Sequence, residues 1–368
     1  MLAADESAVA APSLIVLYHI EKTAGTSVFS WLTQHSDLSF DYGRTHCFFR
    51  LHLDLFPEFR QRRCNSTQQI VGAWRRMRVC VEFHGWSTDK FWTALVPRID
   101  ALRERYASAG GSVVTVLISR EPTAQVLSTY KMWPPYLKGF DANGAKKWTL
   151  MRLPVWLRSR LLVGAATSNG GVFDEARTRR RSKSALVAAS GHRPAGLQAA
   201  HFPIGDFHPA CRCKAAPCLG QRGATTAAIA ASCAIGPPRA DHGYLQACER
   251  GVELRRALER MLPAIFDVVG VTELVDKLLV GIRASDANLR RQNVPTRARH
   301  YQPIGKSTSR FYGVKAWNRQ FDVDVANASV RALLERTVTC DRIVHDVASQ
   351  LAQRGPGGRG LPPVRHTL

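Results

Sequence analysis

Three strand-like runs, each followed by a helical pattern, constrain the fold of this chain more than any other feature. The runs span Leu14–Tyr18, Arg78–His84 and Val113–Ser119. The first and third are almost continuously apolar, which is typical of strands that are buried on both faces. Helical patterns follow the runs at 27–34, 90–108 and 122–132. This alternation predicts an α/β fold, in which helices flank a parallel sheet.

The second half of the chain contains a weakly patterned middle and then regular elements again. Residues 140–250 hold the basic run Arg177–Lys183, several Gly and Pro residues and most of the cysteines, so we expect a poorly defined insertion of mixed order. The regular patterns after it predict three helices and a strand: Val252–Leu262 ended by Pro263, the strand Phe266–Gly270, a helix capped by Thr272 that reaches Ile282, and the closing helix Val330–Gln353.

These patterns predict a single domain over residues 13–352, with the insertion inside it. Residues 1–12 are expected to form an N-terminal tail and residues 353–368 a disordered C-terminal tail. No apolar run approaches the ~20 residues that a membrane-spanning helix needs. The first residues do not resemble a signal peptide. We therefore expect either a cytosolic protein or one whose membrane anchor lies outside this sequence.

The chain is strongly basic. It has 51 Lys and Arg residues against 29 Asp and Glu residues, which gives a formal net charge of +22. Such an excess favours polyanionic partners, which include acidic glycans, nucleotide phosphates, nucleic acids and anionic membranes. No nucleic-acid recognition module is visible, so we expect no nucleic-acid partner.

The nine cysteines are an odd number, which excludes a fully paired disulfide framework. Their spacing around residues 211–218 does not match the paired CxxC pattern of a zinc site, so we expect disulfides or free thiols and no metal. Asn65 and Asn327 each begin an N-glycosylation triplet, a pattern that also arises by chance. The clustered cysteines are Cys211, Cys213, Cys218, Cys233 and Cys248.

The first run leads into the turn His19-Ile-Glu-Lys-Thr-Ala-Gly-Thr-Ser27, which carries the clearest chemical signal. A strand, a tight polar turn and a helix together form an anion site, because backbone N–H groups and the helix dipole converge there. Gly25 permits close approach of the backbone, and Lys22 adds a mobile positive charge. The turn is not a Walker A loop, which needs an earlier glycine and a Lys directly before the helix.

The stretch Lys22-Thr-Ala-Gly-Thr-Ser27 resembles the 5′-phosphosulfate loop of the Golgi carbohydrate sulfotransferases. The heparan sulfate 2-O-sulfotransferases and the chondroitin and dermatan enzymes have a nearly identical stretch, usually with Pro in place of Glu21. The resemblance implies a P-loop-NTPase-like sheet, a place in the Golgi lumen, and the co-substrate 3′-phosphoadenosine-5′-phosphosulfate (PAPS). The residues that it implies at the 5′-phosphosulfate are Lys22, Thr23, Ala24, Gly25, Thr26 and Ser27.

A second match follows the third run, in Ser119-Arg-Glu-Pro122 with Ser128 further along. Pro122 suits the first position of a helix. An Arg at the carboxyl end of a parallel strand projects into the ligand crevice of an α/β sheet, and its guanidinium pairs well with phosphate oxygens. The same sulfotransferases have Arg-x-Pro and Ser-x-Tyr here. The resemblance therefore implies that Arg120 and Ser128 hold the 3′-phosphate of PAPS.

A third match, Phe266–Asp276, has the Val-Gly strand end and the Thr-Glu helix start of the same family, and it is mainly structural. The resemblance covers about 14–135 and 252–352 and does not extend to the insertion. The basic stretch Arg290–Lys315 either closes over the nucleotide, lines the acceptor groove, or is a solvated surface.

Sulfuryl transfer also requires a base that takes the proton of the acceptor hydroxyl. Glu82 and His84 alternate along the second run, so they share one face at the carboxyl end of that strand. The heparan sulfate 2-O-sulfotransferases have His-Gly-His here, whereas this chain has Trp86 in place of the second His. We expect His84 to be the base, with Glu82 in reserve. Lys22 would offset the charge on the leaving phosphate.

The predicted function is transfer of a sulfuryl group from PAPS to a hydroxyl of a carbohydrate, and the basic composition favours an anionic glycan. Tyrosine, lipids and small alcohols stay open as acceptors. A P-loop kinase is a second hypothesis, which the position of Lys22 and the lack of an obvious Mg-binding Asp after a strand disfavour. A third is a catalytically inactive protein that binds polyanions or nucleotides on the same fold.

Overall fold

The structure is a computed structural model of the whole chain. It describes residues 11–20, 22–34, 39–42, 49, 52–59, 78–84, 90–132, 136–140, 146–150, 152–158, 198, 202, 248, 250–291, 296 and 327–354.

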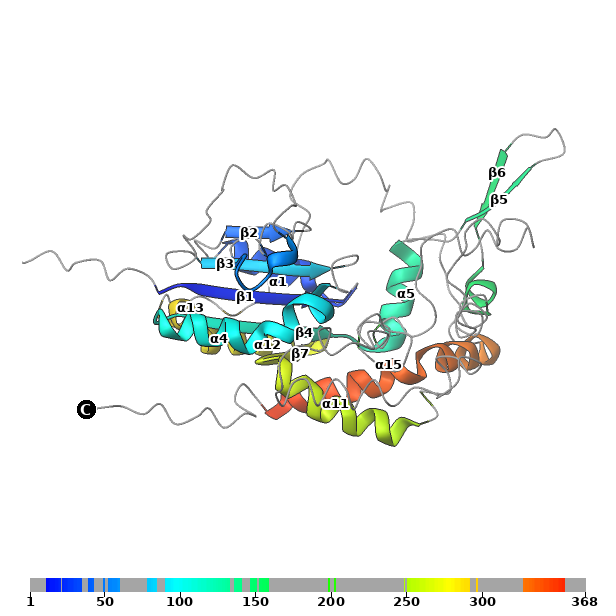
Figure 1. Cartoon of the computed structure of the whole chain (residues 1–368). Coiled ribbons are helices and arrows are strands. Elements are labelled where there is room, and N and C mark those ends of the chain that lie inside the picture. Colours follow the sequence, from blue (N-terminus) through cyan, green and yellow to red (C-terminus); the bar gives the residue numbers. More distant parts are fainter. Residues whose placement is uncertain are drawn as a thin grey trace, which may run out of the picture.

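The main sheet has the strand order β2-β3-β1-β4-β7, and every neighbouring pair is parallel (Figure 1). This arrangement confirms the predicted α/β fold with a parallel sheet. The three strand-like runs form β1, β3 and β4 to within one residue of the predicted limits. The strand bounds are β1 Ser13–His19, β2 Ser39–Tyr42, β3 Arg78–His84, β4 Ser112–Ser119 and β7 Val268–Val271.

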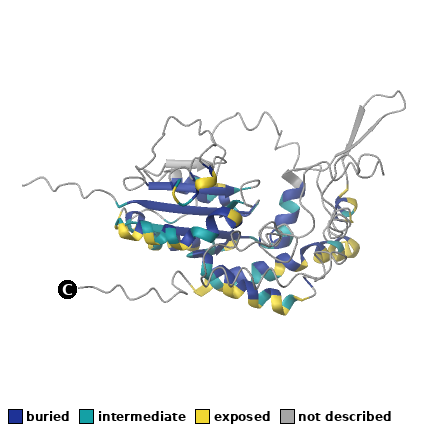
Figure 2. Ribbon diagram, viewed as in Figure 1, coloured by how far each residue is buried: buried dark blue, intermediate teal, exposed yellow. Residues whose placement is uncertain are grey.

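Helices cover both faces of this sheet, and alternate residues of β1 point to the two layers. Ile15 and Leu17 pack against α1 (Gly25–Gln34), α12 (Val275–Ser285) and α13 (Ala287–Arg291). Leu14, Val16 and Tyr18 belong to the core on the other face. That core is formed with α4 (Ile99–Ser108), α11 (Gly251–Ile265) and α15 (Ala328–Arg354). Figure 2 shows that β1 and β3 are buried along their length, as expected for central strands.

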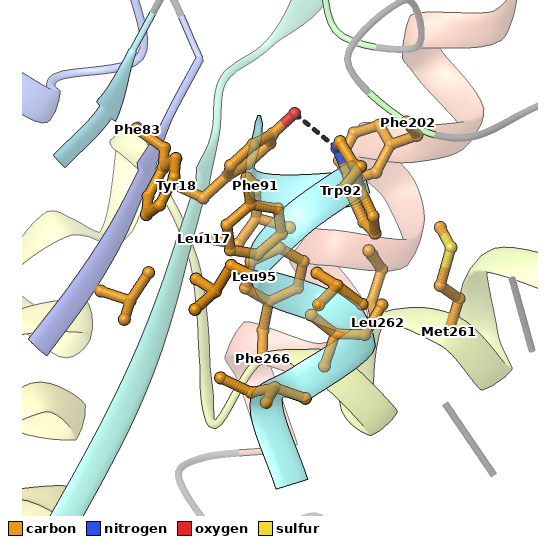
Figure 3. Packing of buried hydrophobic residues seen from close by; sticks show 14 of the residues in the cluster. Tyr18, Phe83, Phe91, Trp92, Leu95, Leu117, Phe202, Met261, Leu262 and Phe266 are labelled. Atoms are coloured by element: carbon orange, nitrogen blue, oxygen red, sulfur yellow. Dashed lines mark hydrogen bonds between the residues drawn. The ribbon is translucent and has the colours of Figure 1, made fainter. Parts of the chain in front are cut away.

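Aromatic side chains fill the core on the α4 face, close to the carboxyl end of β1 (Figure 3). Phe91 and Phe266 stack with their ring centroids 5.4 Å apart. The indole nitrogen of Trp92 donates a hydrogen bond of 2.8 Å to the hydroxyl of Tyr18, so the two polar atoms of this cluster satisfy each other. Phe202, from the predicted insertion, is buried in the same cluster.

The helix predicted over 90–108 is not continuous. The chain forms a π turn, η4 (Phe91–Leu95), and a 3₁₀ turn, η5 (Val96–Arg98), before α4 begins. Pro97 lies in the 3₁₀ turn and has no N–H to donate, which prevents a regular helix here. The irregular turns allow Phe91, Trp92 and Leu95 to be buried together.

Two other predicted helix boundaries are wrong. The helix expected to end at Pro263 continues to Ile265, with Pro263 inside α11, and Met261, Leu262 and Ile265 are buried in the core. Thr272 does not cap a helix. It begins the 3₁₀ turn η10 (Thr272–Leu274), and its hydroxyl donates to the carbonyl of Ser119 at 3.1 Å. The hydroxyl that was expected to cap a helix therefore binds the last residue of β4 instead.

The structure describes some elements in and next to the predicted insertion. Strands β5 (Tyr136–Phe140) and β6 (Lys146–Leu150) form an antiparallel hairpin, and a helical segment follows at 153–158. Trp156 packs against Tyr130 of α5 (Pro122–Met132). A disulfide joins Cys248 to Cys340 of α15, so for Cys248 the structure favours the disulfide alternative over a free thiol. The basic run Arg177–Lys183 and the other clustered cysteines lie outside the described residues.

In the part of the chain that the structure describes, no helix is long and apolar enough to cross a membrane. The described residues also contain no cluster of three or more His, Cys, Asp or Glu side chains that could hold a metal ion.

Candidate functional site

The turn between β1 and α1 has an unusual backbone. Lys22 and Ala24 have φ angles of 65° and 63°, in the left-handed region that residues other than glycine adopt rarely. Strain of this kind is concentrated at functional sites, and turns with left-handed residues form concave arrays of N–H groups that bind anions. Thr23, between them, is buried, and its hydroxyl donates to the carbonyl of Ile20 at 2.7 Å. The hydrogen bond from the Thr23 side chain therefore stabilises the backbone of the predicted anion site.

The residues of the predicted 5′-phosphosulfate loop differ in exposure. Lys22, Ala24 and Ser27 are half-buried, and Thr26 is exposed. Gly25 is the first residue of α1 and is buried. The loop thus lies at the N-terminus of a helix, where the partial positive charge of the helix dipole favours an anion.

The two predicted loops meet at one edge of the sheet. After β1 the chain continues to β2, beyond β3, whereas after β4 the next strand of the sheet is β7 on the other side. The chain therefore leaves the neighbouring strands β1 and β4 in opposite directions. Open α/β sheets bind ligands at such a switch point, outside the carboxyl ends of the two strands. Here a guanidinium nitrogen of Arg120 donates to the carbonyl of Lys22 at 3.0 Å. Arg120, predicted from sequence, thus contacts the first loop directly.

The carboxyl end of β3 adds a cluster of three ionisable side chains. Glu82 and His84 share one face of the strand, as predicted, and His19 lies beside them on β1. The Nδ1 atom of His19 lies 2.5 Å from Oε1 of Glu82, and both side chains are buried. The rings of His19 and His84 are stacked, with centroids 4.2 Å apart.

His19 is a member of the site that the sequence motifs did not indicate. Its position could have suggested a role, because it is the last residue of the central strand and directly precedes the predicted anion site. The register of the sheet then pairs it with His84 and places it beside Glu82, a contact across 63 residues of sequence. The pattern within one strand does not contain that information.

A hydrogen bond determines the tautomer of His84. Its Nδ1 atom lies 3.0 Å from the carbonyl oxygen of His19, which can only accept, so Nδ1 carries the proton. In the neutral imidazole, Nε2 then has the lone pair and can accept a proton. His84 is also only half-buried, whereas Glu82 is 1 % exposed.

Glu82 is a buried carboxylate with an unusual environment. Its Oε2 atom has no hydrogen-bond partner among the described residues. Burial, and after it the negative charge of Glu82, raise the pKa of the neighbouring Cys80 thiol. Burying a carboxylate without a partner costs several kcal/mol, so the hydrogen bond from His19 is important for keeping Glu82 in place.

The ring of His19 fills the space next to Gly25. A Cβ atom on Gly25 would lie 2.1 Å from Cδ2 of His19, far inside contact distance. The imidazole cannot easily move, because His84 stacks on it and Glu82 binds its Nδ1. Packing therefore requires glycine at this position, in addition to the close approach that an anion at the predicted site would need.

We predict that Gly25→Ala lowers the free energy of unfolding by about 1–3 kcal/mol, the usual cost of overpacking a core. Urea denaturation measures it. Gly251→Ala is the matched control, because its Cβ would meet only Cδ1 of Ile343, at 3.2 Å. In a His19→Ala background, Gly25→Ala should cause almost no further loss of unfolding free energy, because the ring that the new Cβ would meet is absent. Equal stability of the two Gly→Ala variants would contradict this packing argument.

Arg120 is followed by a well-capped helix. The carboxylate of Glu121 accepts hydrogen bonds from the N–H groups of Thr123 and Ala124, at 3.0 and 2.6 Å. Pro122 is the first residue of α5, as predicted, and Ser128 lies half-buried in its second turn. Because Glu121 serves as the cap, its carboxylate is engaged with the helix N-terminus. The contact of Ser128 with a phosphate stays a prediction.

Glu21, Trp86 and most of the basic stretch Arg290–Lys315 lie outside the described residues.

No protein-family model matches this chain, and no curated protein or solved structure matches it significantly.

Proposed function

We propose that this chain is a sulfotransferase that moves a sulfuryl group from PAPS to a hydroxyl of a carbohydrate. One observation carries the proposal. The guanidinium of Arg120 donates to the carbonyl of Lys22 at the switch point between β1 and β4, where the chain leaves the two strands in opposite directions. The two segments that resemble the PAPS-binding loops of the Golgi sulfotransferases are thus in contact, at the edge where α/β proteins bind nucleotides.

The described residues are chemically suited to a donor that has a phosphate at the 3′ position of its ribose and a phosphosulfate at the 5′ position. The loop Lys22–Ser27 would hold the 5′-phosphosulfate, because its left-handed residues and the start of α1 favour a compact anion. Arg120 and Ser128 would hold the 3′-phosphate through a guanidinium and a hydroxyl. The β1–loop–α1 unit on a parallel sheet supports a P-loop-NTPase-like fold as part of the proposal.

His84 would act as the general base. The acceptor oxygen forms a bond to sulfur, the bond between sulfur and the bridging oxygen breaks, and that oxygen leaves as part of the phosphate. Nε2 of His84 takes the proton of the acceptor hydroxyl, for which its tautomer is suited. The ammonium of Lys22 offsets the charge that develops on the leaving phosphate. PAPS supplies the activated sulfuryl group.

Glu82, the reserve base, is better suited to a supporting role. It is almost fully buried, and one carboxylate oxygen already binds His19. A buried carboxylate in this position orients the imidazole of His19, which packs on Gly25 and stacks on His84. We therefore favour His84 as the base and assign Glu82 to the support of the two histidines.

Charge and cysteine chemistry support an acidic glycan as the acceptor and the Golgi lumen as the location. A net charge of +22 favours a polyanionic substrate. The disulfide between Cys248 and Cys340 favours an oxidising compartment, because disulfides are rare in the cytosol.

Two measurements test the proposal against its alternatives. Calorimetry should show that adenosine 3′,5′-bisphosphate (PAP), the product of the donor, binds more tightly than ATP. Labelled sulfate should then move from PAPS to at least one of a panel of glycans. Preference for ATP would indicate a kinase. Binding of PAP without transfer to glycans, tyrosine peptides or alcohols would indicate an inactive binding protein.

We predict that Arg120→Ala and Ser128→Ala each weaken PAP binding, with the larger loss at Arg120. A charge-assisted contact is worth ~1.5–3 kcal/mol, which corresponds to about tenfold or more in affinity. Arg342→Ala is the control for loss of a positive charge, because Arg342 lies exposed on α15 and pairs with Glu335. Unchanged affinity in both site variants would remove the assignment of the 3′-phosphate.

A further inference from the structure

A glutamine from the predicted insertion lies against the backbone of Arg120. Gln198 is completely buried, and its side-chain amide contacts both polar backbone groups of Arg120. Its Nε2 atom donates to the carbonyl of Arg120 at 2.5 Å, and its Oε1 atom accepts from the N–H at 3.4 Å. Oε1 also accepts from the hydroxyl of Ser119 at 2.5 Å. The amide thus binds the chain at the residue where β4 ends.

Gln198 is itself held by the closing helix. Its backbone N–H donates to the carboxylate of Asp341 on α15 at 3.0 Å. The neighbouring residue of α15, Cys340, forms the disulfide with Cys248. The insertion is therefore attached to α15 at Gln198 and at Cys248, and the side chain of Gln198 also binds the chain at the end of β4.

His345 of α15 supports the same junction. Its Nδ1 atom lies 3.3 Å from the hydroxyl oxygen of Ser119, and Ser349 lies 3.4 Å from its Nε2 atom. Burial lowers the pKa of His345, which favours the neutral ring. A neutral ring donates from Nδ1 to Ser119 and accepts from Ser349 at Nε2, so the contacts form one continuous chain of hydrogen bonds.

These contacts fix the backbone from which the Arg120 side chain extends. Arg120 follows the last residue of β4, so strand pairing does not fix both of its backbone groups. The amide of Gln198 supplies those hydrogen bonds instead, and the guanidinium then reaches Lys22. Because a buried amide with only part of its hydrogen bonds is costly, the arrangement has one preferred geometry.

We infer that Gln198 is a positioning residue of the donor site, which directs Arg120 toward the 3′-phosphate. This inference rests on the proposed function. The insertion resembles none of the sulfotransferase motifs. Through Gln198 it would help to select a nucleotide that is phosphorylated at the 3′ position. A residue that only stabilises the fold would not change that selection.

The experiment compares the affinities of PAP and AMP, which differ only in the 3′-phosphate. Gln198→Glu keeps the shape of the side chain, but its carboxylate form cannot donate to the Arg120 carbonyl. It should reduce the PAP-to-AMP affinity ratio by roughly three- to tenfold, the equivalent of one lost hydrogen bond. AMP affinity itself should be retained. Arg120→Ala should reduce the ratio further, and adding Gln198→Glu to it should cause no additional loss, because the two residues act through one contact.

A second variant covers the case in which Gln198→Glu does not fold. Ser119→Ala removes the hydroxyl that binds Oε1 of Gln198, and it should lower the same ratio to a smaller extent. Thr115→Val is its control, since it removes another buried hydroxyl of β4, far from the loop, that binds Ile265 and Asp267. That control should lose stability without a change in the ratio.

The outcomes separate the two proposals. If the wild-type protein prefers PAP and both Gln198→Glu and Ser119→Ala keep the wild-type ratio, the inference is wrong and the proposed function stands. The inference is also wrong if the losses from Gln198→Glu and Arg120→Ala multiply. A wild-type protein without preference for PAP over AMP overturns the proposed function, and the role of Gln198 with it.

Discussion

Replacing Lys22 by glycine should lower the turnover of sulfuryl transfer by roughly 10²–10³, the usual effect of removing a group that stabilises developing charge. The affinity for PAP should fall less. The proposed role of the ammonium is strongest in the transition state, when charge moves to the oxygen that leaves sulfur, so its loss should reduce turnover more than ground-state binding. Steady-state kinetics at saturating PAPS, together with calorimetry on PAP, measures the two effects separately.

The choice of glycine follows from the backbone. Lys22 has a φ angle of 65°, so a replacement by alanine would keep a side chain in a strained conformation, whereas glycine adopts it freely. Lys22→Met is the companion variant, because it keeps most of the length without the charge. Equal turnover in the two variants would assign the effect to the ammonium.

Lys277→Met controls for the loss of one positive charge, since Lys277 is exposed on α12. It should have wild-type turnover. If PAP binding collapsed in the Lys22 variants while saturated turnover stayed normal, Lys22 would be a ground-state anchor for the phosphate instead.

The sequence predicted the centre of the fold well, for a physical reason. β1, β3 and β4 are neighbours in the middle of a parallel sheet, so both of their faces are buried and their sequences are strongly patterned. The edge strand β2 (Ser39–Tyr42) was not predicted. It is short and contains the polar residues Ser39 and Asp41, so it lacks such a run.

Helix boundaries were predicted less well, because tertiary contacts override local signals. Pro263 suggested a helix end, but the burial of Ile265 keeps the last turn of α11 against the core. Thr272 suggested a cap, but its hydroxyl binds Ser119 on the neighbouring strand. In both cases the deciding contact involves a residue that the local sequence does not specify.

The candidate site was predicted in part. Lys22, Gly25 and Arg120 follow directly from strand ends, and the structure brings them to one edge of the sheet. His19 and Gln198 were missed because their contacts cross 63 and 78 residues of sequence. Supporting residues of this kind become visible only when the strand order and the path of the insertion are known.

Replacing His84 should lower turnover by ~10²–10⁴, the usual contribution of a general base, while PAP affinity stays nearly intact. His84→Phe is more informative than His84→Ala, because an aromatic ring preserves the stack on His19 and removes only the nitrogens. Transfer rates at saturating PAPS and calorimetry on PAP make the comparison.

Glu82→Gln decides between the two candidate bases. A neutral glutamine can still accept the hydrogen bond from Nδ1 of His19, so the histidines should keep their places and a substantial rate should remain. If Glu82 were the base, this variant would abolish turnover, and His84→Phe would keep more than about a tenth of it. A buried carboxylate already bound to His19 is a poor base, because protonating it also disrupts the pair that supports Gly25 and His84. For this reason we expect the larger loss at His84, and the opposite ranking would exchange the roles of the two residues.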